Sequence, residues 1–573
     1  MLIDGRTLAD NSVVETHVAV IGGGVAGISL ALEFDRFGFP ACLVEAGGDR
    51  RTRRSQALYV GEVSETGDYD LASNRSRCLG GSSNCWAGWC RPFTDTDFAQ
   101  RDWIPNSGWP FGPEALIPYH PRARAILELS DLPFNPQFWL DEVRERGMRL
   151  FPFDPEWLDT VISQFSPPAR LGRSRRAELE RSVTSKVILH ATASNIATDP
   201  VTNNATGADV ILPAGKKLAI KAKYVVIAAG GVENARLLLM SNKVQKEGLG
   251  NKYDVVGRYF MDHPRLRLGR LTLRDPQLYS RLYDVTYHYH NKSFSVDGTR
   301  CGATLGLSAR VQQQERLTQC HTALYASYLG ENWHGVDRCK QIHAAYKSLK
   351  PISLAQVVRA STGMPGSIVT MLTRATRMRK LVDHYLLESV LEPVPDRESR
   401  VTLSGSRDAL GLPRTRLTWR VGEVEKRTHF RAIELIKREV EGRNLGRVEL
   451  DGNPWDDGWR SRVLGTWHHM GTTRMHHDLR LGVVDSNCKV HGVPNLFVAG
   501  SSVFPTGGSN MPTFTIACLA VRLADHIRDL DRRALLYYPA ATQTVRGESA
   551  AERGKQAGKV SMPASGRFDT LPE

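Results

Sequence analysis

The sequence predicts an α/β protein in two parts: a parallel sheet covered by helices, and an α+β part built on an antiparallel sheet. A β-branched run at 17–21 leads straight into a glycine-rich loop and a helical pattern at 28–34. A second apolar strand follows at 41–44, and another strand–glycine–helix unit lies at 224–240. The block 266–455 instead contains segments that alternate polar and apolar residues, which indicates antiparallel strands with one polar face.

The loop after the first strand has glycines at the spacing of a dinucleotide-binding turn. We expect Gly22 to permit the tight turn, Gly24 to let the backbone approach a pyrophosphate, and Gly27 to allow close packing of helix on strand. Free N–H groups at the helix start favour phosphate. Glu45 ends the second strand, where it can accept a hydrogen bond from a ribose hydroxyl. The segment therefore predicts a Rossmann-like site, without deciding between FAD and NAD.

Further cofactor contacts are expected from glycine- and serine-rich segments elsewhere in the chain. Residues 78–92 suggest a loop and helix start whose N–H groups meet a polar ligand, although an ordinary turn is the alternative. A helix beginning near Thr513 would direct its positive N-terminus at the cofactor. The candidate cofactor-binding residues in these segments are Gly80, Gly81, Ser82, Ser83, Asn84, Cys85, Val187, Ala229, Gly230, Gly500, Ser501, Met511 and Thr513.

The two parts are expected to be discontinuous in the sequence. We assign residues 1–100, 183–265 and 456–535 to the cofactor-binding domain, and residues 101–182 and 266–455 to the substrate domain. The polar tail, 540–573, is predicted to be disordered. Within the substrate domain, 353–391 is expected to be helical, and Thr286–His290 is expected to be a strand with two histidines on one solvated or core-edge face.

Composition and charge exclude several classes of protein. The formal net charge of +14 is spread along 573 residues, so a solvated basic surface, or a preference for an anionic partner, is favoured over nucleic-acid binding. The nine cysteines contain no CxxC pair, which favours reduced thiols. We see no transmembrane run and no signal peptide, so we expect a cytoplasmic protein without stable membrane insertion.

The candidate catalytic residues are His468, His469 and Asn510. The histidines lie in a Gly/Thr-rich loop, and imidazole can take a proton near neutral pH. Asn510 precedes an apolar run and can donate a hydrogen bond without carrying charge. Neither a cysteine nor a carboxylate stands at conventional ligand spacing with these histidines, so no metal site is expected.

Four segments together resemble the glucose–methanol–choline (GMC) flavoprotein oxidoreductases. They are the stretch from Gly22 to Glu45, the stretch from Gly80 to Asn84, the stretch from Gly257 to Pro264, and the pair His468 and Asn510. The resemblance implies an FAD enzyme that oxidises CH–OH groups. It also implies that His468, the first histidine of an H-x-x-G-T segment, is the catalytic base, with His469 as the second candidate and Asn510 as its partner.

The resemblance also bears on substrate and cofactor linkage. The residues at 89–92, 398–403 and 502–506 are similar to segments of bacterial sugar, glycoside and pyranose oxidoreductases. We therefore expect oxidation of a sugar, glycoside or polyol hydroxyl, with oxygen or a quinone-like electron acceptor. The alternatives are a non-sugar alcohol, or a non-redox lyase or light-driven member of the fold. Some members attach FAD through a histidine at the position of Cys85. A cysteinyl linkage is the alternative here, and non-covalent FAD is expected. An oligomer is possible.

Overall fold

The structure is a computed structural model of the chain, and it describes residues 1–65, 69–285, 294–328, 338, 341–342, 345, 351–361, 372, 382–450 and 457–537. The chain divides into residues 1–524, which contain every strand described below, and residues 525–573. The tail predicted to be disordered, 540–573, and the predicted strand Thr286–His290 lie outside the described residues.

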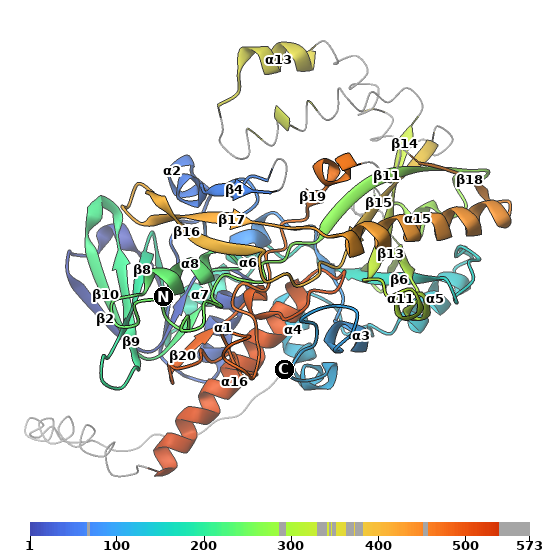
Figure 1. Ribbon diagram of the computed structural model, residues 1–573. Helices are drawn as coiled ribbons and strands as arrows, with labels where there is room; N and C mark the ends of the chain where they lie inside the picture. The colour runs from blue at the N-terminus through green and yellow to red at the C-terminus, as the bar shows by residue number, and fades with distance from the viewer. Residues whose placement is uncertain are drawn as a thin grey trace, which may run out of the picture. The chain divides into compact units, whose positions relative to one another are not determined.

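The first sheet draws its strands from three separate stretches of the sequence (Figure 1). Its core is parallel: β2 (Ser12–Ile21) lies between β3 (Ala41–Val44) and β10 (Lys217–Ile227). Beyond β3 lie β7 (Ser185–Leu189) and then β1 (Leu2–Asp4), and beyond β10 lie β9 (Ala205–Ile211) and then β8 (Thr192–Thr198). The short strand β20 (Leu496–Val498) also pairs with β10. The predicted Rossmann-like sheet is confirmed.

Helices follow the strands of this sheet where the sequence predicts them. The helix α1 (Val25–Arg36) starts at Gly24 and buries one apolar face against β2 and β3. The helix α8 (Glu233–Met240) follows β10, and α16 (Thr513–Tyr537) begins at the predicted position. Because α1, α8 and α16 each start just after a loop, their free N–H groups are available at the loop ends.

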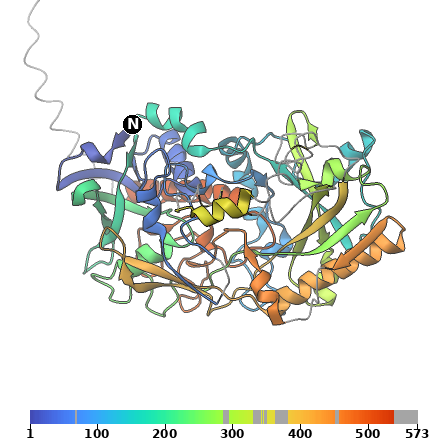
Figure 2. The ribbon, with the colours of Figure 1, turned by 90° about the horizontal axis from the view of Figure 1, so that it is seen from above.

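The second sheet is antiparallel throughout. Its order is β18 (Gly446–Leu450), β11 (Pro264–Leu273), β15 (Val382–Leu391), β14 (Cys320–Tyr328), β13 (Thr299–Leu307), β6 (Leu158–Phe165) and β5 (Trp89–Cys90), with β12 (Ser295–Val296) on β13 and β19 (Leu464–Gly465) on β11. The long helix α15 (Glu423–Gly442), orange in Figure 2, packs against β18, β14 and β15. The predicted antiparallel substrate part is confirmed.

The prediction of one helix over 353–391 is wrong. The helix α13 covers only Leu354–Ser361, and β15 occupies Val382–Leu391. The residues of β15 from Tyr385 onward are buried on both faces, and α15 packs against this strand. A strand covered on both faces shows no period-two alternation, so its apolar residues also fit helical spacing.

Smaller elements connect the two sheets. The hairpin of β16 (Arg400–Arg407) and β17 (Pro413–Thr418) pairs with β4 (Glu62–Ser64) rather than joining the large antiparallel sheet. The short helices are α2 (Arg53–Gln56), α3 (Asp95–Phe98), α4 (His120–Ile126), α5 (Pro136–Glu145), α6 (Leu171–Ser174), α7 (Arg176–Arg181), α9 (Ser280–Tyr283) and α11 (Ala309–Gln314). Among the described helices, none is both long and apolar enough to cross a membrane.

Candidate active site

The glycine loop between β2 and α1 has the sterics of a phosphate-binding turn. Gly22 has a φ of +115°, and a Cβ there would lie 2.6 Å from the carbonyl oxygen of Ala228. A Cβ on Gly27 would lie 1.8 Å from the carbonyl oxygen of Gly22, so α1 can pack this closely only without a side chain. A Cβ on Gly24 would meet no protein atom within 4 Å. That open space borders a cavity, and it lets a ligand approach the backbone.

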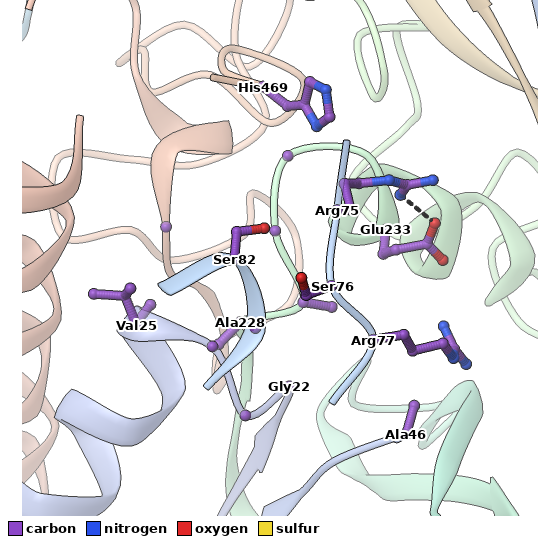
Figure 3. Close-up of a pocket in the computed structure, with 18 of the residues that line it drawn as sticks. Gly22, Val25, Ala46, Arg75, Ser76, Arg77, Ser82, Ala228, Glu233 and His469 are labelled. Atoms are coloured by element: carbon purple, nitrogen blue, oxygen red, sulfur yellow. Dashed lines mark hydrogen bonds and ion pairs between the residues drawn. The ribbon is translucent and has the colours of Figure 1, made fainter. Parts of the chain in front are cut away.

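One cavity runs from this loop to His469 (Figure 3). Both His468 and His469 line it. Among the predicted cofactor-binding residues, those that line the same cavity are Gly22, Gly24, Glu45, Gly81, Ser82, Ser83, Cys85, Ala229, Gly230, Gly500, Ser501 and Thr513. The structure therefore brings the N-terminal fingerprint and the C-terminal histidine loop to one site.

Five predicted cofactor-binding residues do not line this cavity. Val187 is fully buried inside the sheet, and the cavity is reached instead by 191–193. Asn84 turns inward and donates to the carbonyl oxygens of Leu79 (2.9 Å) and Gly81 (3.0 Å), so it holds the loop together. Met511 packs against an apolar cluster in the substrate part. Gly80 and Gly27 do not face the cavity, and each allows two backbone segments beside it to pack closely.

The sequence reasoning missed the segment just before the glycine pair. Asn74 lines the cavity and is buried, yet neither atom of its amide has a partner among the described residues. The Nε of Arg77 is also buried and unpartnered there. Arg75 is held in place by Glu233 at 2.7 Å, as Figure 3 shows. In the sequence, the two basic residues beside Ser76, Arg75 and Arg77, were the feature that could have indicated this part of the site.

These groups fit a dinucleotide such as FAD. Glu45 accepts from the N–H groups of Gly23 (2.8 Å) and Gly47 (2.7 Å), which fixes its carboxylate at the cavity wall. Each of its oxygens keeps a lone pair for a ribose hydroxyl. The unpartnered amide of Asn74 can bind a polar edge of the ligand, and the space at Gly24 can admit a pyrophosphate.

The histidine loop is organised by Asp262, which is fully buried. Its Oδ1 accepts from the backbone N–H of His468 and the hydroxyl of Thr466, both at 2.8 Å. Its Oδ2 accepts from the backbone N–H of Trp467 (2.9 Å) and the hydroxyl of Tyr69 (2.7 Å). Burial raises the pKa of this carboxyl, but the neighbouring histidines and the hydrogen bonds outweigh it and lower the pKa.

His468 is paired with a histidine that sequence reasoning did not single out. The Nδ1 atoms of His468 and His263 are 2.9 Å apart. The Nε2 of His263 lies 2.9 Å from the carbonyl oxygen of Gly508. Burial lowers the pKa of His468 to about 3 and lowers the pKa of His263 as well, so both rings are neutral at neutral pH. In the sequence, the position of His263 directly after Asp262, in the segment 257–264, was the feature that could have indicated its role in the site.

His469 belongs to the same network through another residue. Its Nε2 is 2.8 Å from the hydroxyl of Tyr69, and Tyr69 donates its own proton to Asp262. The hydroxyl of Tyr69 must therefore accept from His469 Nε2–H, and the Nδ1 of His469 is the bare nitrogen. Burial lowers the pKa of His469 to about 4. His469 is thus a neutral hydrogen-bonding group at the cavity wall.

Asp262, His263 and His468 offer ligand atoms within 4.8 Å of one another, a distance that would suit a metal ion. The hydrogen bonds account for this closeness without an ion. Four donors already surround the Asp262 carboxylate, and the His263 and His468 rings are bonded to each other. Burying a carboxylate requires such donors, and this carboxylate has them.

Comparison with known proteins agrees with this geometry. Residues 395–520 match the family model of the GMC oxidoreductases. The chain is 24% identical to 2-methyl-1,2-propanediol dehydrogenase of Mycolicibacterium austroafricanum, over 90% of this chain and 95% of that protein. It is 26% identical to the fructose dehydrogenase large subunit of Gluconobacter japonicus, over 60% of this chain and 54% of that protein.

A solved structure shares the fold of this chain. A solved variant of the formate oxidase of Aspergillus oryzae RIB40 superposes with a TM-score of 0.54, at 18% identity, over 92% of this chain and all of that one. Residues 395–520 therefore carry the C-terminal domain of the GMC oxidoreductases. The prediction of an FAD-dependent oxidoreductase that acts on CH–OH donors is confirmed.

The predicted partner of His468, Asn510, does not lie where it was expected. Asn510 does not line the cavity that His468 lines. It is buried, and its Nδ2 donates to Asp97 Oδ2 at 3.1 Å, while its Oδ1 has no partner among the described residues. Met511 stands between it and Pro512. The imidazole in direct contact with His468 is that of His263.

Proposed function

We propose that this oxidoreductase oxidises a CH–OH group of a sugar, glycoside or polyol, with His468 as the base that takes the hydroxyl proton. One observation carries the proposal. His468 lines the same cavity as Gly22, Gly24 and Gly81, so a base and a dinucleotide site share one space. When bound, FAD supplies the hydride acceptor at N5 of its flavin ring.

The surroundings of His468 suit a base rather than an acid. Its neutral ring is held by the backbone bond to Asp262 and by His263, so its orientation is fixed before substrate arrives. His469 also lines the cavity, but its Nε2–H is engaged with Tyr69. We propose that His469 contacts ligand without taking the proton.

Asn510 has a less direct role in the proposal. Its amide is directed at Asp97, and the Oδ1 that remains unpartnered is the group available for a substrate hydroxyl. We propose that Asn510 mainly stabilises the loop that precedes α16, with any contact to substrate made through this oxygen.

The substrate class rests on the names of the relatives. Besides the fructose dehydrogenase subunit, a C-glycoside 3-oxidase of Microbacterium trichothecenolyticum is 27% identical over 55% of this chain and 48% of that protein. A small non-sugar alcohol is the second candidate, because the relative matched over 90% of the chain is named for a propanediol. Oxygen or a quinone-like compound is proposed as the electron acceptor.

The test is anaerobic flavin reduction. The holoprotein is mixed with a panel of sugars, glycosides, polyols and small diols, and the loss of visible flavin absorbance is followed without added nicotinamide. We expect at least one compound to bleach the flavin and His468→Ala to slow that reduction by about 10²- to 10⁴-fold while retaining FAD. A His468→Ala variant that bleaches at the wild-type rate would refute the assignment of the base.

A further inference from the structure

The ring of His263 forms the middle of a hydrogen-bonded chain that ends at a backbone carbonyl. The chain runs from His468 Nδ1 to His263 Nδ1 at 2.9 Å, and from His263 Nε2 to the oxygen of Gly508 at 2.9 Å. His263 is fully buried, and it does not line the cavity. Its ring contacts the cavity-lining residue His468, and its backbone carbonyl accepts from the hydroxyl of Thr466 at 3.3 Å.

The carbonyl of Gly508 decides the tautomer of His263. A carbonyl oxygen can only accept, so the Nε2 of His263 must carry a hydrogen. Because burial lowers the pKa of His263, the ring is neutral and its second nitrogen, Nδ1, carries a lone pair.

The tautomer of His263 in turn decides that of His468. Since His263 Nδ1 has no hydrogen, the 2.9 Å contact forms only if His468 Nδ1 donates. A neutral His468 then has its bare nitrogen at Nε2. Among the ring nitrogens of this pair, Nε2 of His468 is the one left free to accept a proton from a ligand in the cavity.

We propose that His263 is a positioning residue that holds His468 in the Nδ1–H tautomer and receives the Nδ1 proton when His468 Nε2 takes the substrate hydroxyl proton. This inference rests on the proposed function of His468. The protons balance: the substrate O–H bond breaks as an N–H bond forms at His468 Nε2, and the N–H bond at His468 Nδ1 breaks as one forms at His263 Nδ1. The bond from His263 Nε2–H to Gly508 is kept throughout.

The charges around the pair suit this transfer. The Asp262 carboxylate acts to raise the pKa of both rings, so it stabilises a positive charge on either one. The other groups that act electrostatically on the two rings are His469 and Arg265 near His468, Glu392 near His263, and His321 near both.

Two substitutions of His263 separate the two contacts. In His263→Asn the amide oxygen can stand close to the former Nδ1, so an acceptor for His468 is kept but cannot be protonated. In His263→Gln the amide lies near the former Nε2, so the bond to Gly508 is kept and the acceptor for His468 is lost. His429→Gln is the matched control, because His429 is another fully buried imidazole, it lies on α15, and its pKa is shifted by burial with no charged neighbour contributing.

We expect His263→Gln to slow anaerobic flavin reduction by about 10- to 100-fold, and His263→Asn to slow it less. The solvent deuterium isotope effect on that step should rise in both variants, because removal of the hydroxyl proton becomes more difficult. A merely structural role would lower FAD content or thermal stability without changing this isotope effect. Wild-type rates and isotope effects in both variants would overturn the proposal.

Nitrogen NMR of the histidine-labelled holoenzyme tests the tautomers without any turnover. We expect a hydrogen on His468 Nδ1 and on His263 Nε2, and a hydrogen on His468 Nε2 instead would overturn the proposal even if the His263 variants failed to fold. If His468→Ala reduces flavin normally while the NMR result holds, the proposed function fails and the positioning geometry stands.

Discussion

The hydroxyl of Tyr69 joins Asp262 to His469. It donates to Asp262 Oδ2 at 2.7 Å and accepts from His469 Nε2 at 2.8 Å. Tyr69 follows β4, Asp262 precedes β11, and His469 lies in the loop after β19, so one hydroxyl ties together three distant segments. Because Asp262 also holds the backbone N–H of His468, the position of the proposed base depends on this contact.

Tyr69→Phe should therefore lower both stability and activity. The change leaves a buried N–H of His469 without its acceptor and removes one of four donors from Asp262, at a cost of about 1–3 kcal/mol. Urea unfolding of the holoprotein measures the loss. Tyr283→Phe is the control, because the Tyr283 hydroxyl bonds Thr160 in the substrate part instead. Equal stability and equal flavin reduction in Tyr69→Phe and wild type would contradict the role of this contact.

Asn510→Asp should be less stable at neutral pH than Asn510→Ala. The new carboxylate would stand about 3.1 Å from Asp97 Oδ2 in place of a donor, and two carboxylates so close resist ionising together. We expect Asn510→Ala to slow flavin reduction far less than His468→Ala, which thermal unfolding and rapid mixing together would establish. If Asn510→Ala were as slow as His468→Ala at unchanged stability, the direct substrate contact predicted from the sequence would hold instead.

The sequence was most informative where local sterics alone set the structure. The strand, loop and helix around Gly22 lie where predicted, because a glycine fingerprint and a following helix are local features. The prediction of a helix at β15 failed because the pairing of this strand with β11 and β14 and its burial under α15 depend on residues outside the segment. Periodicity carries no information about such neighbours.

The candidate site shows the same division. His468 was singled out by its spacing to Gly471, and it lines the same cavity as the glycine loop. The contact with His263 could not be predicted, because it joins residues more than 200 positions apart through a single pair of nitrogens. Similarly, nothing in the sequence shows that Asp97 engages the amide of Asn510.

Gly27→Ala should abolish FAD binding or prevent folding. The added Cβ would lie 1.8 Å from the carbonyl oxygen of Gly22, and a backbone atom in a packed loop cannot move aside cheaply. Gly24→Ala is the informative companion, because its Cβ meets no protein atom and stands only where ligand would lie. We expect Gly24→Ala to fold with normal stability as apoprotein and to bind FAD weakly, as flavin fluorescence titration would show. Normal FAD affinity in Gly24→Ala would place the pyrophosphate elsewhere.

Non-covalent FAD should be released on denaturation. Cys85 lines the cavity and is exposed, and its thiol lies 3.4 Å from the carbonyl oxygen of Ser82. We expect acid precipitation of the holoprotein to leave all flavin in the supernatant, and Cys85→Ser to retain FAD. Flavin that remains in the washed pellet of the wild type, but not of Cys85→Ser, would show a cysteinyl linkage and refute this prediction.

Acid should destabilise the protein through its buried histidines. An unfolded histidine has a pKa of about 6.5, whereas burial lowers the pKa of His429 and of His468 to about 3 and that of His469 to about 4. Between these values and 6.5 the unfolded chain binds more protons than the folded one, so stability falls as pH decreases through that window. His429 alone should contribute about 1.4 kcal/mol per pH unit below about pH 6. Thermal unfolding should show a lower Tm at acidic than at neutral pH, with a shallower dependence in His429→Gln, and an identical dependence in that variant would contradict the assignment.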